Sequence, residues 1–445
     1  MHFLRAVRSA AIPKRQLQAR LSFRPLPSRA HSLAAHRHAI APFSSQGHLQ
    51  RKLEVEASNK GLAIRPPQAA EIKRQHLPYL WLRDNCRCTQ CVNQDTMQRN
   101  FNTFEIPRDI CAQSVESTSN AVSVTWSDGH QSSYDWQFLQ FYLSSDHRED
   151  EVRQSLSLWG AEAADSPPTV SYAEVMADDQ GVARLTSKIK SHGFVFVDGT
   201  PHDDPDATRQ LLERIAFVRI THYGGFYDFI PDLALADTAY TNLALAAHTD
   251  TTYFTDPAGL QAFHLLSHHP APGDDAKADA AGGKSLLVDG FHAARVLQAE
   301  DARAYEILST VRLPWHASGN AGIAIAPDRQ YPVLELSADT CELHRVRWNN
   351  DDRGVVPFGG GFTPDEWYDV ARKWDAILRR KECECWIQLQ PGKTLIFDNW
   401  RVLHGRSAFT GIRRICGAYI NRDDFVSRWR NTNFPRSKIL EAVIG

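Results

Sequence analysis

The segment Lys393-Thr-Leu-Ile-Phe-Asp-Asn-Trp-Arg-Val-Leu-His-Gly-Arg406 predicts a buried strand, then a turn, then a histidine directly before a glycine. Far upstream, His248-Thr-Asp250 opens the run 249–255, in which Asp250 is the only charged residue. Residues i and i+2 of a strand face the same side, so we expect His248 and Asp250 to point together from a strand near the core. Two imidazoles and one carboxylate, with vacant positions opposite, are typical ligands of non-haem Fe(II) oxygenases. We therefore predict that His248, Asp250 and His404 bind iron.

A second His-x-Asp tripeptide competes with this interpretation. His202-Asp203-Asp204 lies between Pro201 and Pro205 in a polar stretch, where exposure to solvent explains it better. A single His-x-Asp has little specificity, because most such tripeptides are structural or solvated. The third ligand, His404, raises the specificity of the set.

An arginine follows the distal histidine by nine residues. Its planar guanidinium group binds a carboxylate through paired, charge-assisted hydrogen bonds, which suits a dicarboxylate cosubstrate beside the iron. Arg413 is the candidate for this role, and the neighbouring Arg414 is its rival. The simpler alternative is that Arg413 is only a surface charge.

Charge is distributed unevenly along the 445 residues. The 50 basic and 52 acidic side chains give a net charge of −2, but the first 53 residues contain ten Lys or Arg and no acid. This pattern predicts a mitochondrial transit peptide over residues 1–50, cleaved near 40–55, and a location in the mitochondrial matrix. The alternative is a basic arm for nucleic acid. The remaining chain carries 40 basic against 52 acidic residues, so we expect no nucleic-acid partner, and no apolar run is long enough to predict a membrane span.

Short strand patterns outnumber helical ones after residue 169, which predicts a mainly β core with flanking helices. We expect strands at residues 193–197, 260–266, 285–288, 385–389 and 394–397, and helices at 172–176, 205–220 and 362–380. Upstream, residues 53–145 predict a small β domain with strands at 77–82 and 121–126. A linker is expected at 146–168, a large domain at 169–445, and a flexible surface insertion at 270–283.

Clustered cysteines in the small domain predict a second metal site. Cys86-Arg-Cys88-Thr-Gln-Cys91 contains three thiols within six residues, and His130 could complete a closed, structural Cys3His zinc site. The alternative is a set of unligated thiols. Cys383-Glu-Cys385 has no nearby histidine and receives no metal, and Cys111, Cys341 and Cys416 are expected to be buried apolar residues.

Four segments carry a resemblance to a known family: residues 237–254, 283–291, 398–406 and 417–424. They resemble the trimethyllysine and γ-butyrobetaine dioxygenases, which are Fe(II)- and 2-oxoglutarate-dependent oxygenases of carnitine biosynthesis. The resemblance extends over about residues 76–425. It implies a double-stranded β-helix (jelly-roll) catalytic domain, ascorbate as reductant, O2 and a small-molecule substrate as partners, and a homodimer.

The resemblance also implies roles for individual residues. His248, Asp250 and His404 would bind the iron, Arg413 would bind the far carboxylate of 2-oxoglutarate, and Ser285 would assist it. The Cys86, Cys88, Cys91 and His130 set resembles the zinc site of γ-butyrobetaine dioxygenase, whereas trimethyllysine dioxygenases often lack the middle cysteine.

A trimethylammonium group has no N–H donors, so proteins hold it against aromatic faces by cation–π attraction. The candidates are Tyr223, Tyr227, Tyr240 and Tyr419, of which Tyr240 and Tyr419 match cage positions of the family. Tyr227 stands where the family usually has Trp, which would weaken the cage or shift its wall to Phe226. Each tyrosine taken singly is better explained as core packing, but the positions of Tyr240 and Tyr419 around the motif favour the cage for these two.

Asp237 favours trimethyllysine as the substrate, because the corresponding position in γ-butyrobetaine dioxygenase is Asn and only trimethyllysine has an α-ammonium group. Asn349 or Asn350 resembles the family's carboxylate-contacting Asn. The expected reaction is hydroxylation of N6,N6,N6-trimethyl-L-lysine to 3-hydroxy-trimethyllysine, the first step of carnitine biosynthesis. The alternatives are that Asp237 merely caps a turn, that the substrate is γ-butyrobetaine, and, more remotely, that the chain is a non-catalytic methylammonium-binding module.

Overall fold

The computed structural model describes residues 54–65, 75–143, 156–230, 241–270, 282–359 and 361–444. The chain divides into two units, Met1–Lys52 and Leu53–Gly445. The expected transit peptide, most of the expected insertion, Asp237 and Tyr240 lie outside the described residues. Within the described ranges, no helix has the length and apolar character needed to cross a membrane.

The N-terminal part of the second unit consists of two small antiparallel sheets. One contains β1 (Glu54–Ala57), β2 (Gly61–Arg65) and β3 (Gln75–Pro78), and the other contains β4 (Ala112–Ser117), β5 (Ala121–Trp126) and β6 (Gln131–Asp135). Two helices, α1 (Tyr79–Asp84) and α2 (Trp136–Leu143), and the 3-10 helix η1 (Thr103–Glu105) complete it. Alternate residues of β5 are buried, as expected for a half-buried strand.

The strand expected at residues 77–82 ends early. β3 stops at Pro78, and residues 79–84 form α1 instead. Tyr79 and Leu82 are both buried, and a spacing of three places them on one face of a helix. The apolar run is therefore explained by a buried helical face, and the prediction of a strand over its second half was wrong.

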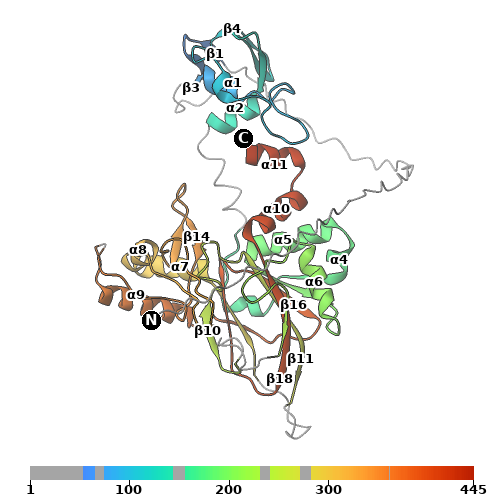
Figure 1. Cartoon of the computed structure of the whole chain (residues 1–445), viewed down its shortest axis with the longest axis vertical. Helices are drawn as coiled ribbons and strands as arrows, with labels where there is room; N and C mark the ends of the chain where they lie inside the picture. Colours follow the sequence, from blue (N-terminus) through green and yellow to red (C-terminus); the bar gives the residue numbers. More distant parts are fainter. Residues whose placement is uncertain are drawn as a thin grey trace, which may run out of the picture. The chain divides into compact units, whose positions relative to one another are not determined.

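The larger part contains two sheets that share a core. The first has the strand order β10 (Leu245–His248), β17 (Val402–Arg406), β12 (Ser285–Asp289) and β15 (Cys385–Ile387). The second has the order β7 (Thr169–Ser171), β8 (Phe194–Asp198), β16 (Lys393–Asp398), β11 (Leu260–His269), β18 (Ile412–Ile420) and β9 (Tyr227–Phe229). One buried cluster takes Leu287 and Val402 from the first sheet and Phe196, Leu265 and Phe397 from the second. The two sheets therefore pack face to face (Figure 1).

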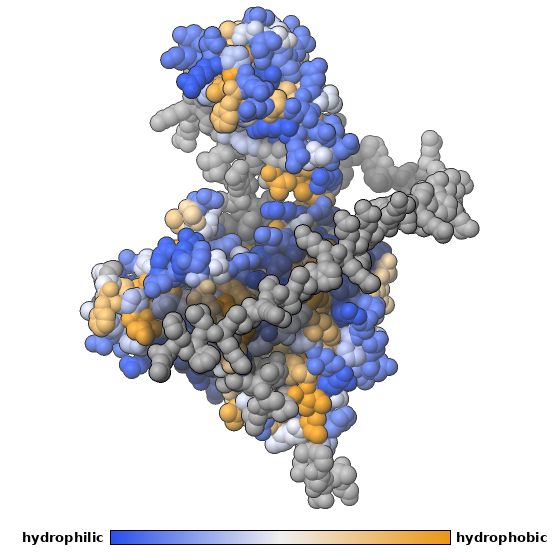
Figure 2. All heavy atoms as spheres, in the orientation of Figure 1, coloured by the Kyte–Doolittle hydropathy of each residue, from blue (hydrophilic) through white to orange (hydrophobic). Residues whose placement is uncertain are grey.

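Helices cover the outer sides of this pair of sheets (Figure 1). Buried residues of α5 (Asp179–His192), α6 (Pro205–Glu213) and α10 (Arg422–Asn433) pack on the six-stranded sheet, with α4 (Tyr172–Ala177) beside them. A second core joins α7 (Gly290–Glu300), α8 (Ala302–Thr310) and α9 (Pro364–Leu378) to the four-stranded sheet and to the hairpin β13 (Leu334–Leu336) and β14 (Leu343–Val346). The chain ends with α11 (Arg436–Ile444). Hydrophilic residues predominate on the face that Figure 2 shows, as expected for a surface in contact with water.

The mainly β core with flanking helices is confirmed, with two differences. α6 ends at Glu213, not at residue 220, and Val218 pairs instead with Ile420 in an isolated bridge. Part of the expected linker is packed: the 3-10 helix η2 spans Ala161–Ala164, and Trp159 is 5% exposed. The Trp159 indole donates to His192 O at 2.5 Å, and Arg401 Nη2 donates to Ser157 O at 2.6 Å. Residues 156–168 thus belong to the packed structure, because a buried Trp and a buried guanidinium group fix them.

Candidate active site

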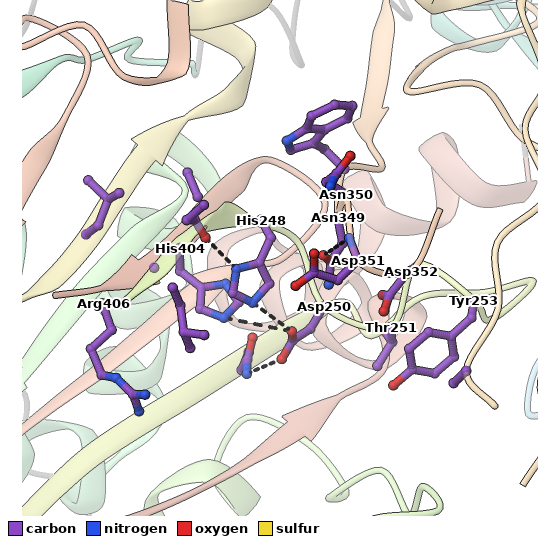
Figure 3. Close-up of a pocket in the computed structure, with 18 of the residues that line it drawn as sticks. His248, Asp250, Thr251, Tyr253, Asn349, Asn350, Asp351, Asp352, His404 and Arg406 are labelled. Atoms are coloured by element: carbon purple, nitrogen blue, oxygen red, sulfur yellow. Dashed lines mark hydrogen bonds and ion pairs between the residues drawn. The ribbon is translucent and has the colours of Figure 1, made fainter. Parts of the chain in front are cut away.

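The three expected iron ligands meet at the edge of the four-stranded sheet. β10 and β17 are antiparallel neighbours in which His248 lies opposite His404, so strand pairing joins residues far apart in sequence. Their ring centroids are 4.3 Å apart. Asp250 Oδ1 lies 3.3 Å from His248 Nε2 and 3.9 Å from His404 Nε2 (Figure 3). All three donor atoms lie within 4.8 Å of one another, a spacing that can hold one metal ion.

The glycine after His404 allows the two strands to approach. A Cβ atom on Gly405 would lie 2.5 Å from the backbone oxygen of Leu245 in β10. Only a residue without a side chain fits at that distance. Gly405 therefore permits the close approach of β17 to β10 that places His404 beside His248.

Asp250 reaches the site differently from the way we expected. β10 ends at His248, so Asp250 lies in the loop after the strand and not in it. Asn399 holds its backbone: Asn399 Oδ1 accepts from Asp250 N at 2.8 Å, and Asn399 Nδ2 donates to Asp250 O at 2.9 Å. The next residue, Thr251, has φ 57°, an unusual conformation for a β-branched residue. Strain of this kind at a ligand loop is typical of functional sites.

The two oxygens of the Asp250 carboxylate have different partners. Its Oδ2 accepts from Tyr419 Oη at 2.7 Å and from Gln261 Nε2 at 2.6 Å. Its Oδ1 faces the two imidazoles. Hydrogen bonds to one oxygen fix the orientation of the other, as partners of metal ligands commonly do.

The charges of the cluster favour the metal-binding protonation states of Asp250 and His404, whereas they favour a protonated His248. Burial would raise the pKa of Asp250, but His404, His248 and the Tyr419 hydroxyl keep it well below its usual value. Burial and the neighbouring His248 lower the pKa of His404 to about 3. Burial opposes protonation of His248, yet the adjacent Asp250 outweighs it, so the pKa of His248 lies above its usual value. His248 Nδ1 lies 2.8 Å from Ala246 O, so a proton on Nδ1 leaves Nε2 available as a ligand.

The cluster lines a cavity of about 1230 Å³. Every described residue that the sequence predicted for cosubstrate or substrate also lines it, namely Tyr223, Tyr227, Ser285, Asn349, Asn350, Arg413 and Tyr419. The second His-x-Asp, at His202, lies elsewhere in an exposed loop. The structure thus brings the described candidates together around one hollow.

Arg413 and Arg414 occupy opposite environments. Arg413 is 4% exposed on β18, and its Nε has no partner among the residues that the structure describes. Burial and the nearby Arg406 lower its pKa to about 10. Arg414 is paired at the surface with Asp228, at 2.8 Å from its Nε. A buried cation that lines a cavity needs an anion, so Arg413 is the stronger candidate for binding a carboxylate.

Two of the predicted tyrosines form an aromatic corner. Tyr227 and Tyr419 have ring centroids 6.0 Å apart, and Phe263 lies 6.3 Å from Tyr227. Tyr227 Oη donates to Ala262 O at 2.8 Å, which fixes its ring. Phe226, considered as a substitute wall, packs instead against the core under the helices. Tyr223 also lines the cavity, and its ring contacts the tilted ring of His222 with 3.9 Å between the centroids.

Several residues of the site were missed by the sequence reasoning. Asn399 and Gln261, which hold Asp250, and Asp351 and Asp352, which line the cavity, have no periodic or spacing signal. Their importance arises from contacts between residues far apart in sequence. Only Asn399 lies within a segment quoted for the family resemblance.

The cysteine cluster of the N-terminal part is compact. Cys86, Cys88 and Cys91 place their Sγ atoms 3.3, 3.6 and 3.4 Å from His130 Nε2. A tetrahedral zinc ion with ordinary Zn–S and Zn–N bonds separates such atoms by about 3.6 Å. The four side chains therefore fit a zinc ion. Of the other cysteines, Cys416 is buried as expected, but Cys111 and Cys341 are exposed, so that prediction was wrong for both.

Comparisons with known proteins agree with this geometry. Residues 151–419 match the family described as "Taurine catabolism dioxygenase TauD, TfdA family", and residues 54–140 match "Gamma-butyrobetaine hydroxylase-like, N-terminal". The first match defines the chain as a dioxygenase of the TauD fold and thus as an enzyme.

More similar relatives are known. The trimethyllysine dioxygenase of Neurospora crassa is 63% identical over 99% of this chain and 98% of its own length. The mitochondrial trimethyllysine dioxygenase of Homo sapiens is 36% identical over 79% of this chain and 82% of its own. The chain belongs to the trimethyllysine dioxygenases. A solved taurine dioxygenase from Burkholderia xenovorans is 14% identical over 55% of this chain and 82% of that one, with a TM-score of 0.40, a likeness too weak to bear on function.

Proposed function

We propose that the chain hydroxylates N6,N6,N6-trimethyl-L-lysine at carbon 3 in an Fe(II)- and 2-oxoglutarate-dependent reaction, the first step of carnitine biosynthesis. The observation that carries the proposal is the convergence of His248, Asp250 and His404 on the wall of a cavity that Arg413 also lines. The relatives named trimethyllysine dioxygenase support this substrate over γ-butyrobetaine. A binding-only module has no need for three metal ligands.

In this proposal each residue has a defined task. His248 Nε2, His404 Nε2 and Asp250 Oδ1 hold Fe(II), which together with 2-oxoglutarate and O2 supplies the oxidising chemistry. Arg413 binds the carboxylate of 2-oxoglutarate that lies away from the metal, with Ser285 beside it. Gln261 and Tyr419 keep Oδ2 of Asp250 occupied, so that this ligand offers one oxygen. Ascorbate is the expected external reductant.

The aromatic corner suits the quaternary end of the substrate. A trimethylammonium group near Tyr227 and Tyr419 would gain roughly 0.5–2 kcal/mol from cation–π attraction. We also propose that Tyr223, Tyr240 and Asp237 contribute to substrate binding, and that Asn349 or Asn350 contacts the α-carboxylate. Asn349 is half-buried, and its Oδ1 accepts from Asp351 N at 3.0 Å, which fixes the turn that carries both residues.

The same reasoning extends to the organisation of the chain. We propose that the two packed sheets form a double-stranded β-helix and that residues 53–145 form a separate small domain with a structural zinc bound by Cys86, Cys88, Cys91 and His130. The catalytic domain would then begin near residue 156. Residues 1–50 would direct the chain to the mitochondrial matrix, in line with the mammalian relatives named mitochondrial. A homodimer is the expected assembly.

The test of the reaction uses purified protein with Fe(II), 2-oxoglutarate and ascorbate. Trimethyllysine and γ-butyrobetaine are incubated separately, and products are analysed by mass spectrometry and by NMR. We expect a gain of about 16 Da, one oxygen atom, for trimethyllysine, with the hydroxyl on carbon 3 and one succinate per product. Hydroxylation of γ-butyrobetaine alone would overturn the proposal. Metal content is measured on the same sample.

A further inference from the structure

A short acidic turn, residues 348–352, is hydrogen-bonded to the segment 248–252, which carries the proposed ligands His248 and Asp250. Thr249, which lies between His248 and Asp250, donates its backbone N–H to Trp348 O at 2.7 Å and accepts from Trp348 N on its Oγ1 at 3.0 Å. Thr252 Oγ1 donates to Asp352 Oδ2 at 2.6 Å. These bonds connect residues 348 and 352 to the chain on both sides of Asp250. The turn therefore keeps a fixed distance from the proposed iron site.

Asp352 stands out among the residues of this turn. It is half-buried, whereas Asp351 is exposed, and its backbone oxygen accepts from His316 N at 2.9 Å. Figure 3 shows Asp352 with Asp250, Thr251 and Asn349 around the cavity. A carboxylate thus lies near the metal ligands without belonging to them.

The proposed substrate carries two cations with different needs. The trimethylammonium group has no N–H and suits the aromatic corner of Tyr227 and Tyr419. The α-ammonium group has three N–H donors, and when it leaves water it needs an acceptor, best a charged one. A carboxylate has two oxygens that can each accept more than one hydrogen bond, so the bond from Thr252 does not exclude a further donor.

Distance along the substrate decides where the α-ammonium group must lie. Carbon 3 is bonded to the α-carbon, so the α-nitrogen lies about 2.5 Å from the carbon that reacts at the metal. The residue that binds this nitrogen must therefore be close to the iron ligands. Asp352 meets this condition, because it is hydrogen-bonded to Thr252, two residues after Asp250, and lines the same cavity as Asp250. The aromatic corner comes from β9 and β18, and thus from elements other than the turn that carries Asp352.

We propose that Asp352 binds the α-ammonium group of the substrate and so selects an α-amino acid over a quaternary amine that lacks this group. The inference rests on the proposed function and names a recognition residue for it. Asp352 and the Tyr227–Tyr419 corner then hold the two cations at opposite ends of the substrate, which fixes the carbon presented to the metal. Asp237, which is also proposed to bind this end of the substrate, lies outside the described residues.

The experiment compares two substrates that differ only in the α-amino group. Trimethyllysine and 6-(trimethylammonio)hexanoate, its deamino analogue, are assayed with the wild type and with Asp352→Asn. Because asparagine still offers an oxygen to Thr252, the turn should persist. We expect the variant to lose about 30-fold in kcat/KM for trimethyllysine, mainly through KM, and less than about threefold for the analogue. Where turnover of the analogue is too slow, its inhibition constant against trimethyllysine replaces kcat/KM.

Two controls make the result specific. Asp339→Asn removes the same charge at an exposed position that does not line the cavity, and we expect the ratio of the two kcat/KM values to stay within about threefold of the wild type. Anaerobic titration of Asp352→Asn with Fe(II) should give one site per chain, as in the wild type, because the three ligands are intact. An equal loss for both substrates in Asp352→Asn would overturn the inference. So would a change of preference in Asp339→Asn or Asp237→Asn that Asp352→Asn does not show.

The outcomes also separate this inference from the proposed function. Wild-type protein that leaves trimethyllysine unchanged would overturn the function itself. Wild-type turnover of trimethyllysine with an unchanged preference in Asp352→Asn would overturn only the role of Asp352.

Discussion

Among the residues that the structure describes, two clusters of side chains could hold a metal ion, and they differ in the number of donors and in their surroundings. Cys86, Cys88, Cys91 and His130 offer four donors, whereas the cluster of His248, Asp250 and His404 offers three and borders a cavity of about 1230 Å³. Four protein donors complete a tetrahedral site and leave no position for a substrate. Three donors on one side leave positions open for other molecules. The donor count thus supports the proposals of a structural role for the first cluster and a catalytic role for the second.

The clusters also differ in how the chain assembles them. Three of the four zinc-type donors come from a single short segment, Cys86 to Cys91, and only His130 is brought from a neighbouring hairpin. The catalytic cluster instead depends on the pairing of β10 with β17. The first is therefore a property of local sequence, and the second is a property of the whole sheet.

Asp250→Ala should have the largest effect of the substitutions considered, because it disables the three-donor cluster and leaves the cysteine cluster intact. The variant removes the only carboxylate of the three-donor cluster and leaves the Tyr419 hydroxyl and the Gln261 amide without their acceptor. We expect Fe(II) binding to fail and succinate formation to fall by at least about 1000-fold, while zinc content stays unchanged. Asp369→Ala, on the exposed side of α9, is the control and should keep full turnover. Substantial succinate formation by Asp250→Ala would move the iron elsewhere.

Arg413→Met tests the open side of the catalytic cluster. Loss of two charge-assisted hydrogen bonds should raise the KM for 2-oxoglutarate about 100-fold. Arg414→Met is a matched control, since Arg414 is the next residue on β18 and pairs at the surface with Asp228. Steady-state kinetics with varied 2-oxoglutarate measure both. Equal effects in the two variants would contradict the assignment of Arg413.

Acid should weaken the binding of Fe(II), with one proton taken up for each metal ion released. The pKa of His248 lies above its usual value, that of His404 is about 3, and that of Asp250 is well below its usual value. Only His248 must then lose a proton when metal binds at mildly acidic pH. Fe(II) affinity is expected to fall about tenfold per pH unit as pH drops from 6.5 to 5. Anaerobic titrations at several pH values measure the slope, and a slope near two would show that His404 is also protonated.

His130→Ala should have the smallest effect on turnover. It removes one of four donors, so zinc content should fall from about one per chain to near zero. We expect kcat per bound iron to stay within about threefold, because His130 contacts none of the catalytic ligands that the structure describes. Cys111→Ser, an exposed cysteine outside the cluster, is the control and should keep its zinc. A loss of kcat that parallels the loss of zinc would show that the two clusters are not independent.

Local chemistry made much of this predictable from the sequence. His248 follows an apolar stretch and precedes a polar turn, and His404 follows an apolar stretch and precedes a glycine. The cysteines have the close spacing of metal ligands. The contacts that hold the ligands were not predictable: Asn399 bonds to Asp250 across 149 residues, and Gln261 lies in an ordinary strand pattern. The second half of the run 77–82 was taken for a strand because Tyr, Leu and Trp suit both structures, and tertiary burial of Tyr79 and Leu82 decided for a helix.

The anchoring of Ser157 and Trp159 has a practical consequence for anyone who shortens the chain. A fragment that starts at residue 169 would remove the indole from beside Phe194, where the ring centroids are 4.8 Å apart. Emptying a site of that size usually costs about 3–5 kcal/mol, and the guanidinium group of Arg401 would lose an acceptor as well. Expression boundaries for an isolated oxygenase fragment therefore belong upstream of Leu156, and crystallisation or directed-evolution work that trims further would start from a weakened scaffold.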